Sequence, residues 1–284
     1  MKFRIEEDLL GKMEIPVESL YGIHTQRALN NFKISNSRIS EYSIFLQGLI
    51  LTKKACAAAN GEIGTLSAKE SQMILKACDK ILGDLPDYLP SFPIDVFQGG
   101  AGTSTNMNVN EVIANVGLKI NGYDAGNYQH LHPNDHVNKS QSTNDVYPTG
   151  FRVAIYFYIN KLIESIISLS DQLELKAIEF SDVLKMGRTQ LQDAVPMSLG
   201  DEFRAWATNL KEEIKNLENS RDLILEVNLG GTAIGTGVNA PANFSEVSIK
   251  YLREFTGAPF VRSPNLIEAT SDCGAYVMLS GALM

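Results

Sequence analysis

Three clusters of small, polar residues are the parts of this chain best suited to do chemistry on a small molecule. They occupy residues 99–108 (GGAGTSTNMN), 132–150 (HPNDHVNKSQSTNDVYPTG) and 187–193 (GRTQLQD). Hydroxyl and amide side chains donate hydrogen bonds, and glycine lets a ligand approach the backbone closely. Such clusters predict a pocket wall around a small ligand that accepts many hydrogen bonds.

Each cluster lies immediately before or at the start of a predicted helix. The unpaired N–H groups and the positive dipole end of a helix N-terminus attract anions. If the three helix starts converge, their Thr, Ser and Asn donors match the oxygens of a carboxylate. A simpler alternative stays open, because Ser142, Thr143 and Asn144 could do no more than cap the helix that follows them.

Other interpretations of individual residues are weaker. The GGAGTS stretch lacks the Gly-Lys-Ser/Thr ending of a nucleotide phosphate loop. His132 and His136 are four residues apart and could bind zinc, but Pro133 intervenes and no third ligand is evident. Lys139 could be a solvated surface charge, and Arg188 could form a structural ion pair. Neither a Gly-x-Ser-x-Gly nucleophile motif nor a pair of glycosidase-type carboxylates stands out.

Long helices are predicted to carry these clusters. Periodicity and capping signals predict helices over residues 41–59, 67–83 (opening with the capping box SAKE), 104–120, 148–180, 199–227 and from Asn265 or Ser271 onward. Residues 1–40 are predicted to be irregular, and the prolines of residues 86–93 predict an extended crossing. Because strands do not alternate with helices, we expect a mainly α fold and no nucleotide-binding α/β fold.

Two of these helices are about 30 residues long, or about 45 Å at 1.5 Å per residue. The second one carries an apolar seam made of Leu199, Phe203, Trp206, Leu210, Ile214, Leu217 and Ile224. Helices of this length seldom bury a seam inside a small monomer. We therefore expect a long bundle that several subunits share.

The composition is that of a soluble globular protein. The 284-residue chain has a net charge of −8, with 44% hydrophobic and 20% charged residues. It has no basic stripe, so nucleic acid and anionic membranes are not expected partners. Cys56, Cys78 and Cys273 show no paired spacing, and the sequence has no signal peptide and no run of 18 apolar residues. These features predict a cytoplasmic protein with reduced thiols.

Several longer motifs resemble the fumarase/aspartase superfamily, and most closely its aspartate ammonia-lyase branch. The similar segments are RIEEDLLGKMEIP, YGIHTQRALNNF, DVFQGGAGTSTNMNVNEVIAN, HPNDHVNKSQSTNDVYPTGFRVA, LKMGRTQLQDAVPMSLGDEFRA and EVNLGGTAIGTGVN. The resemblance implies a mostly helical N-terminal domain over residues 1–140 and the first part of a long-helix domain over residues 141–284. It also implies a homotetramer that shares a helical core, with active sites where segments from different subunits meet.

The resemblance further implies that ammonia is eliminated from L-aspartate to give fumarate. After a base removes a Cβ proton, the β-carboxylate takes up negative charge as an aci-carboxylate. Thr103, Ser142 and Thr143 would bind this group as an oxyanion hole does. Asn144, with Thr103, would contact the amino group, and Ser104 would belong to the same substrate-binding set. The family implies no organic cofactor, although some members respond to Mg²⁺.

The third cluster separates two activities within the superfamily. Thr189 and Gln190 would help to hold the α-carboxylate end of the substrate. Fumarases typically have Gly-Arg-Thr-His where this chain has Gly-Arg-Thr-Gln, and Gln cannot act as a general acid or base near neutral pH. The GGAGTS stretch, where fumarases have GSGTQS, points the same way. A hydratase that interconverts malate and fumarate is therefore the less favoured alternative.

A second departure concerns the catalytic base. In the family, this base is a Ser on a Gly-Ser-Ser loop followed by Met-Pro-x-Lys-x-Asn-Pro, and neither motif occurs in this sequence. From the resemblance, we expect that the chain stops before this loop and has little or no lyase activity alone. A third hypothesis, from another class, is a non-catalytic helical assembly.

Overall fold

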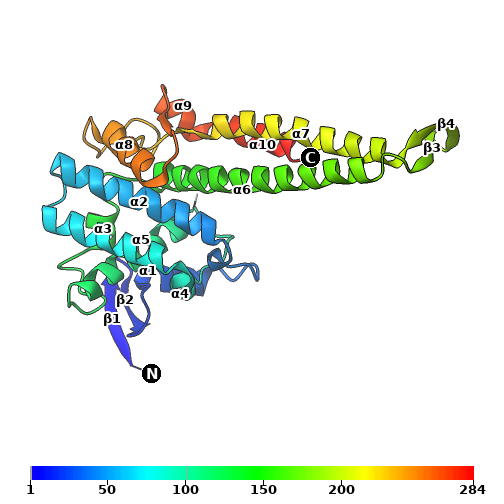
Figure 1. The fold of residues 1–284 in the computed structure, drawn as a ribbon. Helices are drawn as coiled ribbons and strands as arrows, with labels where there is room; N and C mark the ends of the chain where they lie inside the picture. The colour runs from blue at the N-terminus through cyan, green and yellow to red at the C-terminus, as the bar shows by residue number, and fades with distance from the viewer. Residues whose placement is uncertain (1, 101) are drawn as a thin grey trace. The chain divides into compact units, whose positions relative to one another are not determined.

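Helices dominate the computed structural model of the protein, which describes residues 2–100 and 102–284 (Figure 1). The expectation of a mainly α fold is confirmed. Two compact units are formed by Met1–Ile155 with Leu225–Asp272 and by Tyr156–Ile224 with Cys273–Met284. The long helix α6 (Thr143–Glu179) therefore begins in the first unit and continues in the second. The domain boundary expected after residue 140 stays a prediction.

An antiparallel hairpin opens the first unit. It consists of β1 (Phe3–Asp8) and β2 (Gly11–Pro16), with Phe3 opposite Pro16 and Asp8 opposite Gly11. Helix α1 (Ile23–Asn31) follows. The prediction of an irregular segment over residues 1–40 was wrong, because the alternation of apolar and charged residues in each strand is only four residues long.

Three helices enclose the core of the first unit. They are α2 (Ser43–Ile63), α3 (Ala68–Gly83) and α5 (Thr103–Ile120). The fully buried side chains between them include Leu46, Leu49, Ile50, Ile74, Val112 and Ile113. The capping box predicted for α3 is present, because Ser67 Oγ accepts the Glu70 N–H and the Glu70 carboxylate accepts the Ser67 N–H.

Two predictions for this unit were wrong, one for the end of a helix and one for an extended segment. Helix α2 continues to Ile63 and ends at Gly64, whose φ is +87°. The prolines of residues 86–93 do not form an extended crossing, because the chain makes helix α4 (Leu85–Tyr88) and a 3₁₀ turn (Leu89–Ser91). Both elements carry a proline at their first positions, where its missing N–H leaves no helical hydrogen bond unmade.

Residues 225–272 return to the first unit. Strand β5 (Glu226–Val227) pairs in parallel with β6 (Val261–Arg262). Helix α8 (Phe244–Thr256) packs on α2, where Glu62 accepts hydrogen bonds from Lys250 at 2.8 Å and from Tyr251 at 2.6 Å. Helix α9 (Leu266–Ser271) is capped by the Asn265 side chain, one of its two predicted starts.

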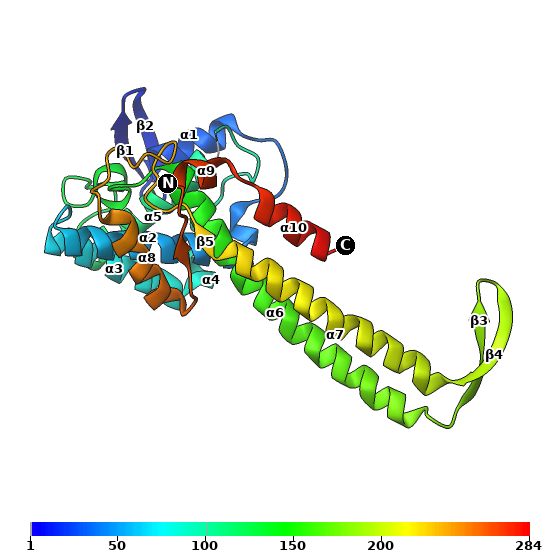
Figure 2. The same ribbon diagram turned by 90° about the horizontal axis from the view of Figure 1, so that it is seen from above.

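The second unit is built on a pair of long helices. From Tyr156 onward, α6 lies beside α7 (Leu199–Ile224), as Figure 2 shows. Ser170 Oγ donates to the Ala207 carbonyl at 3.2 Å, and Lys211 pairs with Glu174 at 2.9 Å. The antiparallel strands β3 (Leu184–Thr189) and β4 (Gln192–Ser198) join the two helices, and α10 (Gly274–Ala282) packs against α7.

One helix among the described residues is long and apolar enough to cross a membrane. It is α6, with a mean hydropathy of 1.3 over 18 residues. Length and composition alone carry this result, and the core helix of a helical bundle has the same properties. Arg152 and Lys161 interrupt its apolar half. The expectation that no segment spans a membrane stays a prediction.

Candidate functional site

The first and second polar clusters meet at the starts of α5 and α6. Gly102 precedes α5 with a φ of +89°, and a Cβ atom there would lie 2.4 Å from the Tyr147 ring. Glycine therefore allows α5 to begin this close to α6. One turn further along α5, Asn106 Nδ2 donates a hydrogen bond to Thr143 Oγ1, on the first residue of α6, at 3.1 Å. Both clusters thus contribute to one site in the first unit.

The side chains at these two helix starts combine exposure with available donors. Thr103 is exposed, whereas Ser104, Ser142 and Thr143 are half-buried. In the first turn of α5, Gln98 Oε1 accepts the Thr105 N–H at 2.8 Å, and the N–H groups of the two residues before it stay available for a ligand. Ser142 Oγ accepts the Asn144 N–H at 3.2 Å, so the alternative in which this cluster caps α6 also holds in part.

A buried amide network lies beneath the first turn of α6. Lys53 is fully buried in α2, and its Nζ donates to Asn138 Oδ1 and to Gln141 Oε1, both at 2.8 Å. Asn138 Oδ1 also accepts hydrogen bonds from Asn106 Nδ2 and Asn110 Nδ2, both at 3.2 Å. Because its amine is removed from water, the pKa of Lys53 falls to about 7. The network connects the core helices α2 and α5 to the polar loop before α6.

Asp145 connects the start of α6 to the glycine-rich segment at residues 228–239. Its Oδ1 accepts the Ser142 N–H at 2.9 Å. Its Oδ2 accepts the N–H groups of Gly230 at 3.1 Å and Thr232 at 2.9 Å. The side chain is fully buried, and burial raises its pKa to about 6 despite these three donors. Asp145 therefore acts inside the protein and does not face a ligand.

Pro148 lies inside α6 and has no N–H for the carbonyl group of Asn144, four residues earlier. The Asn228 side chain replaces that donor, because its Nδ2 lies 3.0 Å from the Asn144 carbonyl oxygen. The Asn144 side chain in turn donates to the Ala233 carbonyl at 2.8 Å. Residues 228–233 thus replace the hydrogen bond that Pro148 cannot make and orient the Asn144 side chain.

The third polar cluster lies in the second unit, at the tip of the β3–β4 hairpin. Thr189 and Gln190 are both exposed, and Gln190 has a φ of +52°. The prediction that this cluster precedes a helix was wrong, because strand β4 intervenes before α7. Arg188 does form the expected structural ion pair, with Asp193 across the hairpin at 3.0 Å.

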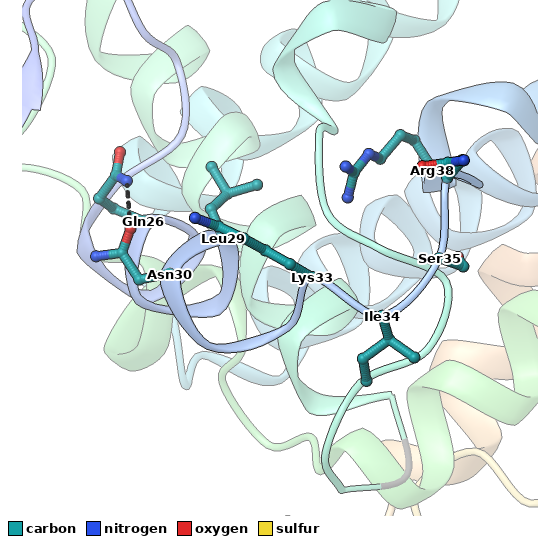
Figure 3. A pocket seen from close by; sticks show the side chains of 8 residues that line it. Gln26, Leu29, Asn30, Lys33, Ile34, Ser35 and Arg38 are labelled. Carbon is teal, nitrogen blue, oxygen red and sulfur yellow. Dashed lines mark hydrogen bonds between the residues drawn. The ribbon is translucent and has the colours of Figure 1, made fainter.

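Two cavities of the first unit differ in their relation to the predicted site. One of about 710 Å³ has Thr103 in its wall, together with His24, Arg27, Glu111 and His132. Its Arg27 is already held by the Asp8 carboxylate at 2.7 and 2.8 Å. The other cavity, of about 530 Å³, appears in Figure 3 and contains none of the predicted site residues. It is lined by Gln26, Leu29, Asn30, Lys33, Ile34, Ser35, Asn36 and Arg38.

The zinc alternative for His132 and His136 gains no support. His132 Nδ1 accepts the backbone N–H groups of Asn134 and Asp135, both at 3.1 Å, and His136 Nδ1 accepts the N–H of His132 at 2.9 Å. These nitrogen atoms therefore shape the turn at Pro133–Val137. Within residues 2–100 and 102–284, no three His, Cys, Asp or Glu side chains gather as metal ligands.

Sequence reasoning missed the residues that support the cluster from inside. Lys53 lies in a mostly apolar helix. A lysine among apolar residues is a sequence signal that could have indicated a buried charge with hydrogen-bond partners. Asn106 was visible only as one polar residue among several. Nothing in the sequence indicates that residues 228–239 would bond to Asp145, because that contact spans more than 80 residues.

Comparisons with known proteins identify the family of this chain. A family model described as a lyase matches residues 11–284. The aspartate ammonia-lyase of Escherichia coli (strain K12) is 57% identical over 280 residues, which are 99% of this chain and 58% of that protein. The aspartate ammonia-lyase of Corynebacterium glutamicum is 53% identical over 282 residues, which are 99% of this chain and 53% of that protein.

Solved structures give the same result. The fumarate lyase:delta crystallin from Brucella melitensis bound to cobalt matches with a TM-score of 0.96 and 46% identity, over 99% of this chain and 61% of that one. The class II fumarase from Schistosoma mansoni matches with a TM-score of 0.88 and 32% identity, over 99% of this chain and 62% of that one. The chain thus spans less than two thirds of the length of these relatives. It belongs to the lyase family whose model covers residues 11–284 and, within the fumarase/aspartase superfamily, is similar to aspartate ammonia-lyases.

Proposed function

We propose that this chain carries the substrate cradle of an aspartate ammonia-lyase, which converts L-aspartate into fumarate and ammonia. The observation that carries the proposal is the hydrogen bond from Asn106 to Thr143, since it supports one cradle made from two helix starts. The similarity to curated aspartate ammonia-lyases, 57% over 280 residues for the one from E. coli, supports the same substrate.

The cradle fits the charge that develops during the reaction. Removing a Cβ proton places negative charge on the β-carboxylate, so donors aimed at its oxygens stabilise the transition state more than the substrate. Thr103, Ser142 and Thr143 would supply hydroxyl donors, and the first two residues of α5 would add N–H groups. These local donors compensate for the net charge of −8, which would otherwise repel a dicarboxylate.

Asn144 and Ser104 complete the proposed cradle. The Nδ2 group of Asn144 is engaged by the Ala233 carbonyl at 2.8 Å, so Oδ1 is the atom that would accept a hydrogen bond from the substrate ammonium group. A carbonyl acceptor there would hold the leaving group while the β-carboxylate is held by the hydroxyl donors. Ser104, on the same turn of α5 as Thr103, would add a further hydroxyl.

Thr189 and Gln190 of a neighbouring subunit would hold the α-carboxylate end of the substrate, as the resemblance implies for a site where segments of different subunits meet. Gln190 can donate and accept hydrogen bonds but cannot exchange a proton near neutral pH. A hydration reaction that needs an acid or base at this position is therefore disfavoured, and the ammonia-lyase is preferred over the hydratase.

The proposed enzyme is a cytoplasmic homotetramer. Exposed apolar side chains along the second unit support a shared helical core, because such faces are normally covered. They include Tyr158, Ile167, Leu169, Leu175, Ile178 and Trp206. The reaction proposed needs no organic cofactor, and Mg²⁺ would act only as an activator.

The activity is tested by offering L-aspartate and L-malate separately and following fumarate by its ultraviolet absorbance. Because the curated relatives are longer, the assay compares two proteins. One is the 284-residue chain, and the other is this chain joined at Met284 to the remaining segment of the E. coli relative. We expect the joined protein to release fumarate and ammonia from L-aspartate, and the chain alone to show little or no turnover.

Two outcomes would contradict the proposal. Faster use of L-malate than of L-aspartate would indicate the hydratase. Oligomers of a well-folded joined protein that use neither substrate would indicate a non-catalytic assembly. Thr143→Val in the joined protein tests whether Thr143 binds the substrate or only supports the fold, since it removes one hydroxyl while nearly preserving side-chain volume. We expect a loss of about tenfold or more in kcat/KM, as for loss of an oxyanion donor.

A further inference from the structure

We propose that the buried Lys53 sets the hydrogen-bond direction of the amide network, through Asn138 and Asn106, so that Thr143 presents a donor to a bound carboxylate. Lys53 and Asn106 are thus positioning residues that make the cradle selective for carboxylate over amide ligands. The inference rests on the proposed function for its ligand, but the direction of the hydrogen bonds can be tested without one.

The direction begins at Lys53 in its charged form, because an ammonium group has donors and no acceptor. Its Nζ lies 2.8 Å from one side-chain oxygen each of Asn138 and Gln141. Neither amide can be turned around, since an NH₂ group would then face the ammonium group. The charge on Lys53 therefore determines which end of each amide faces it.

The direction then passes from Asn138 to Asn106. The Oδ1 atom that Asn138 turns toward Lys53 also lies 3.2 Å from Asn106 Nδ2 and 3.2 Å from Asn110 Nδ2. Both neighbours must present NH₂ groups to an oxygen that can only accept. Asn106 is only 1% exposed, so water cannot easily take the place of either partner.

The last step reaches the cradle. The same NH₂ group of Asn106 lies 3.1 Å from Thr143 Oγ1 and donates to it. The Thr143 oxygen is thereby an acceptor on its buried side, and its own proton must point elsewhere. A carboxylate oxygen can accept that proton, whereas the NH₂ of an amide ligand can only donate to the second lone pair of Thr143 Oγ1 and leaves the Thr143 proton without an acceptor in that group.

The surroundings of Lys53 are consistent with this role. Cys56, Cys78 and Asp145 are the titratable groups that act on its charge. Burial keeps both thiols protonated by raising their pKa values, which leaves Asp145 as the source of negative charge. The two amide oxygens supply the hydrogen-bond acceptors that a buried ammonium group requires.

The first test compares Asn106→Leu with Asn108→Leu. Both residues are buried on α5, but Asn108 Nδ2 donates to the Ser91 carbonyl at 3.0 Å and does not contact Asn138 or Thr143. Titration calorimetry measures Kd for fumarate and for the monoamide of fumaric acid, per folded molecule. Neither substitution changes charge, so the ratio of the two Kd values reports on donor direction.

We expect the native chain and the Asn108→Leu variant to prefer fumarate to the same extent. The preference should fall by about threefold to tenfold in Asn106→Leu, since Thr143 Oγ1 then has both lone pairs for the monoamide and its proton is no longer held toward the ligand. An unchanged ratio in Asn106→Leu, or an equal fall in both variants, would overturn the proposal. Loss of stability without a change in the ratio would identify a merely structural residue.

The second test is neutron diffraction from a crystal of the perdeuterated chain, which locates deuterons directly. The proposal requires the deuterons of Asn106 Nδ2 to face Asn138 and Thr143, and the Thr143 hydroxyl deuteron to point away from Asn106. A Thr143 deuteron directed at Asn106 would overturn it. If the native chain binds neither ligand, the proposed function fails for this chain, and the neutron map alone decides the direction of the network.

Discussion

Replacing Gly102 with alanine should disturb the place where the two polar clusters meet. Gly102 has a φ of +89°, and an added Cβ would lie 2.4 Å from ring carbons of Tyr147. The positive φ costs an L-residue about 1–2 kcal/mol. The contact adds about 1–3 kcal/mol, because the ring or the start of α5 must move. We therefore expect Gly102→Ala to destabilise the chain by about 2–5 kcal/mol.

Gly122 provides a matched control at the other end of α5. Its φ is +80°, but an added Cβ would meet nothing within 4 Å. Gly122→Ala should therefore carry only the backbone cost of about 1–2 kcal/mol. The difference between the two variants isolates the contact with Tyr147, at about 1–3 kcal/mol.

Urea denaturation followed by circular dichroism measures both losses of stability, and calorimetry measures fumarate binding by the folded variants. We expect Gly102→Ala alone to weaken fumarate binding, since only this change shifts the start of α5 relative to α6. Equal losses of stability, within about 0.5 kcal/mol, would refute the packing argument. Unchanged fumarate affinity in Gly102→Ala would refute its connection to the cradle.

Three further predictions concern other parts of the first unit. Gly48→Ala should lower the free energy of unfolding, measured by urea denaturation, by several kcal/mol, because the added Cβ would lie 2.3 Å from a backbone oxygen of α6. Gly83→Ala, whose Cβ would meet open space, should be neutral or stabilise the chain by up to about 1 kcal/mol. Burial lowers the pKa of Lys53 to about 7, so the unfolded chain keeps this proton to higher pH. The free energy of unfolding should rise above pH 7 by up to about 1.4 kcal/mol per pH unit, and Lys53→Met should lack that increment when the two proteins are compared at each pH. Asp145→Asn should speed hydrogen exchange by about tenfold at one or more of the three backbone N–H groups that donate to the Asp145 carboxylate. Asp201 is the control, because its exposed carboxylate accepts one backbone N–H, that of Ser198. Asp201→Asn should change exchange at that N–H alone. Slower or unchanged exchange in Asp145→Asn would contradict its role as an anchor.

The helical framework was predictable because its signals are local. The capping box at Ser67 and the apolar periodicity of residues 104–120 each predicted a helix that the structure contains. The amino-terminal hairpin was missed because each strand alternates apolar and charged residues over only four positions, which is a weak strand signal, and only Glu6 and Ile15 are buried among its residues. The prolines of residues 86–93 misled because proline both ends helices and begins them.

The candidate site was predictable in its residue types but not in its support. Thr103 and Thr143 stood out because clusters of hydroxyl and amide side chains at predicted helix starts are a local pattern. That Asn106 would donate to Thr143 depends on how the fold brings α5 to the start of α6, which no local pattern encodes. The same is true of Lys53, whose partners lie 85 and 88 residues away. Long-range packing determines which polar residues face a ligand and which hold the others in place.

The central claim is that a dicarboxylate binds where α5 and α6 begin, and amide chemical-shift mapping tests it most directly. Fumarate is titrated into the ¹⁵N-labelled native chain while backbone resonances are followed. The account predicts saturable shifts concentrated at Thr103, Ser104, Ser142 and Thr143. No shift at these residues, or shifts confined to the cavity with Lys33 and Arg38 in Figure 3, would contradict it.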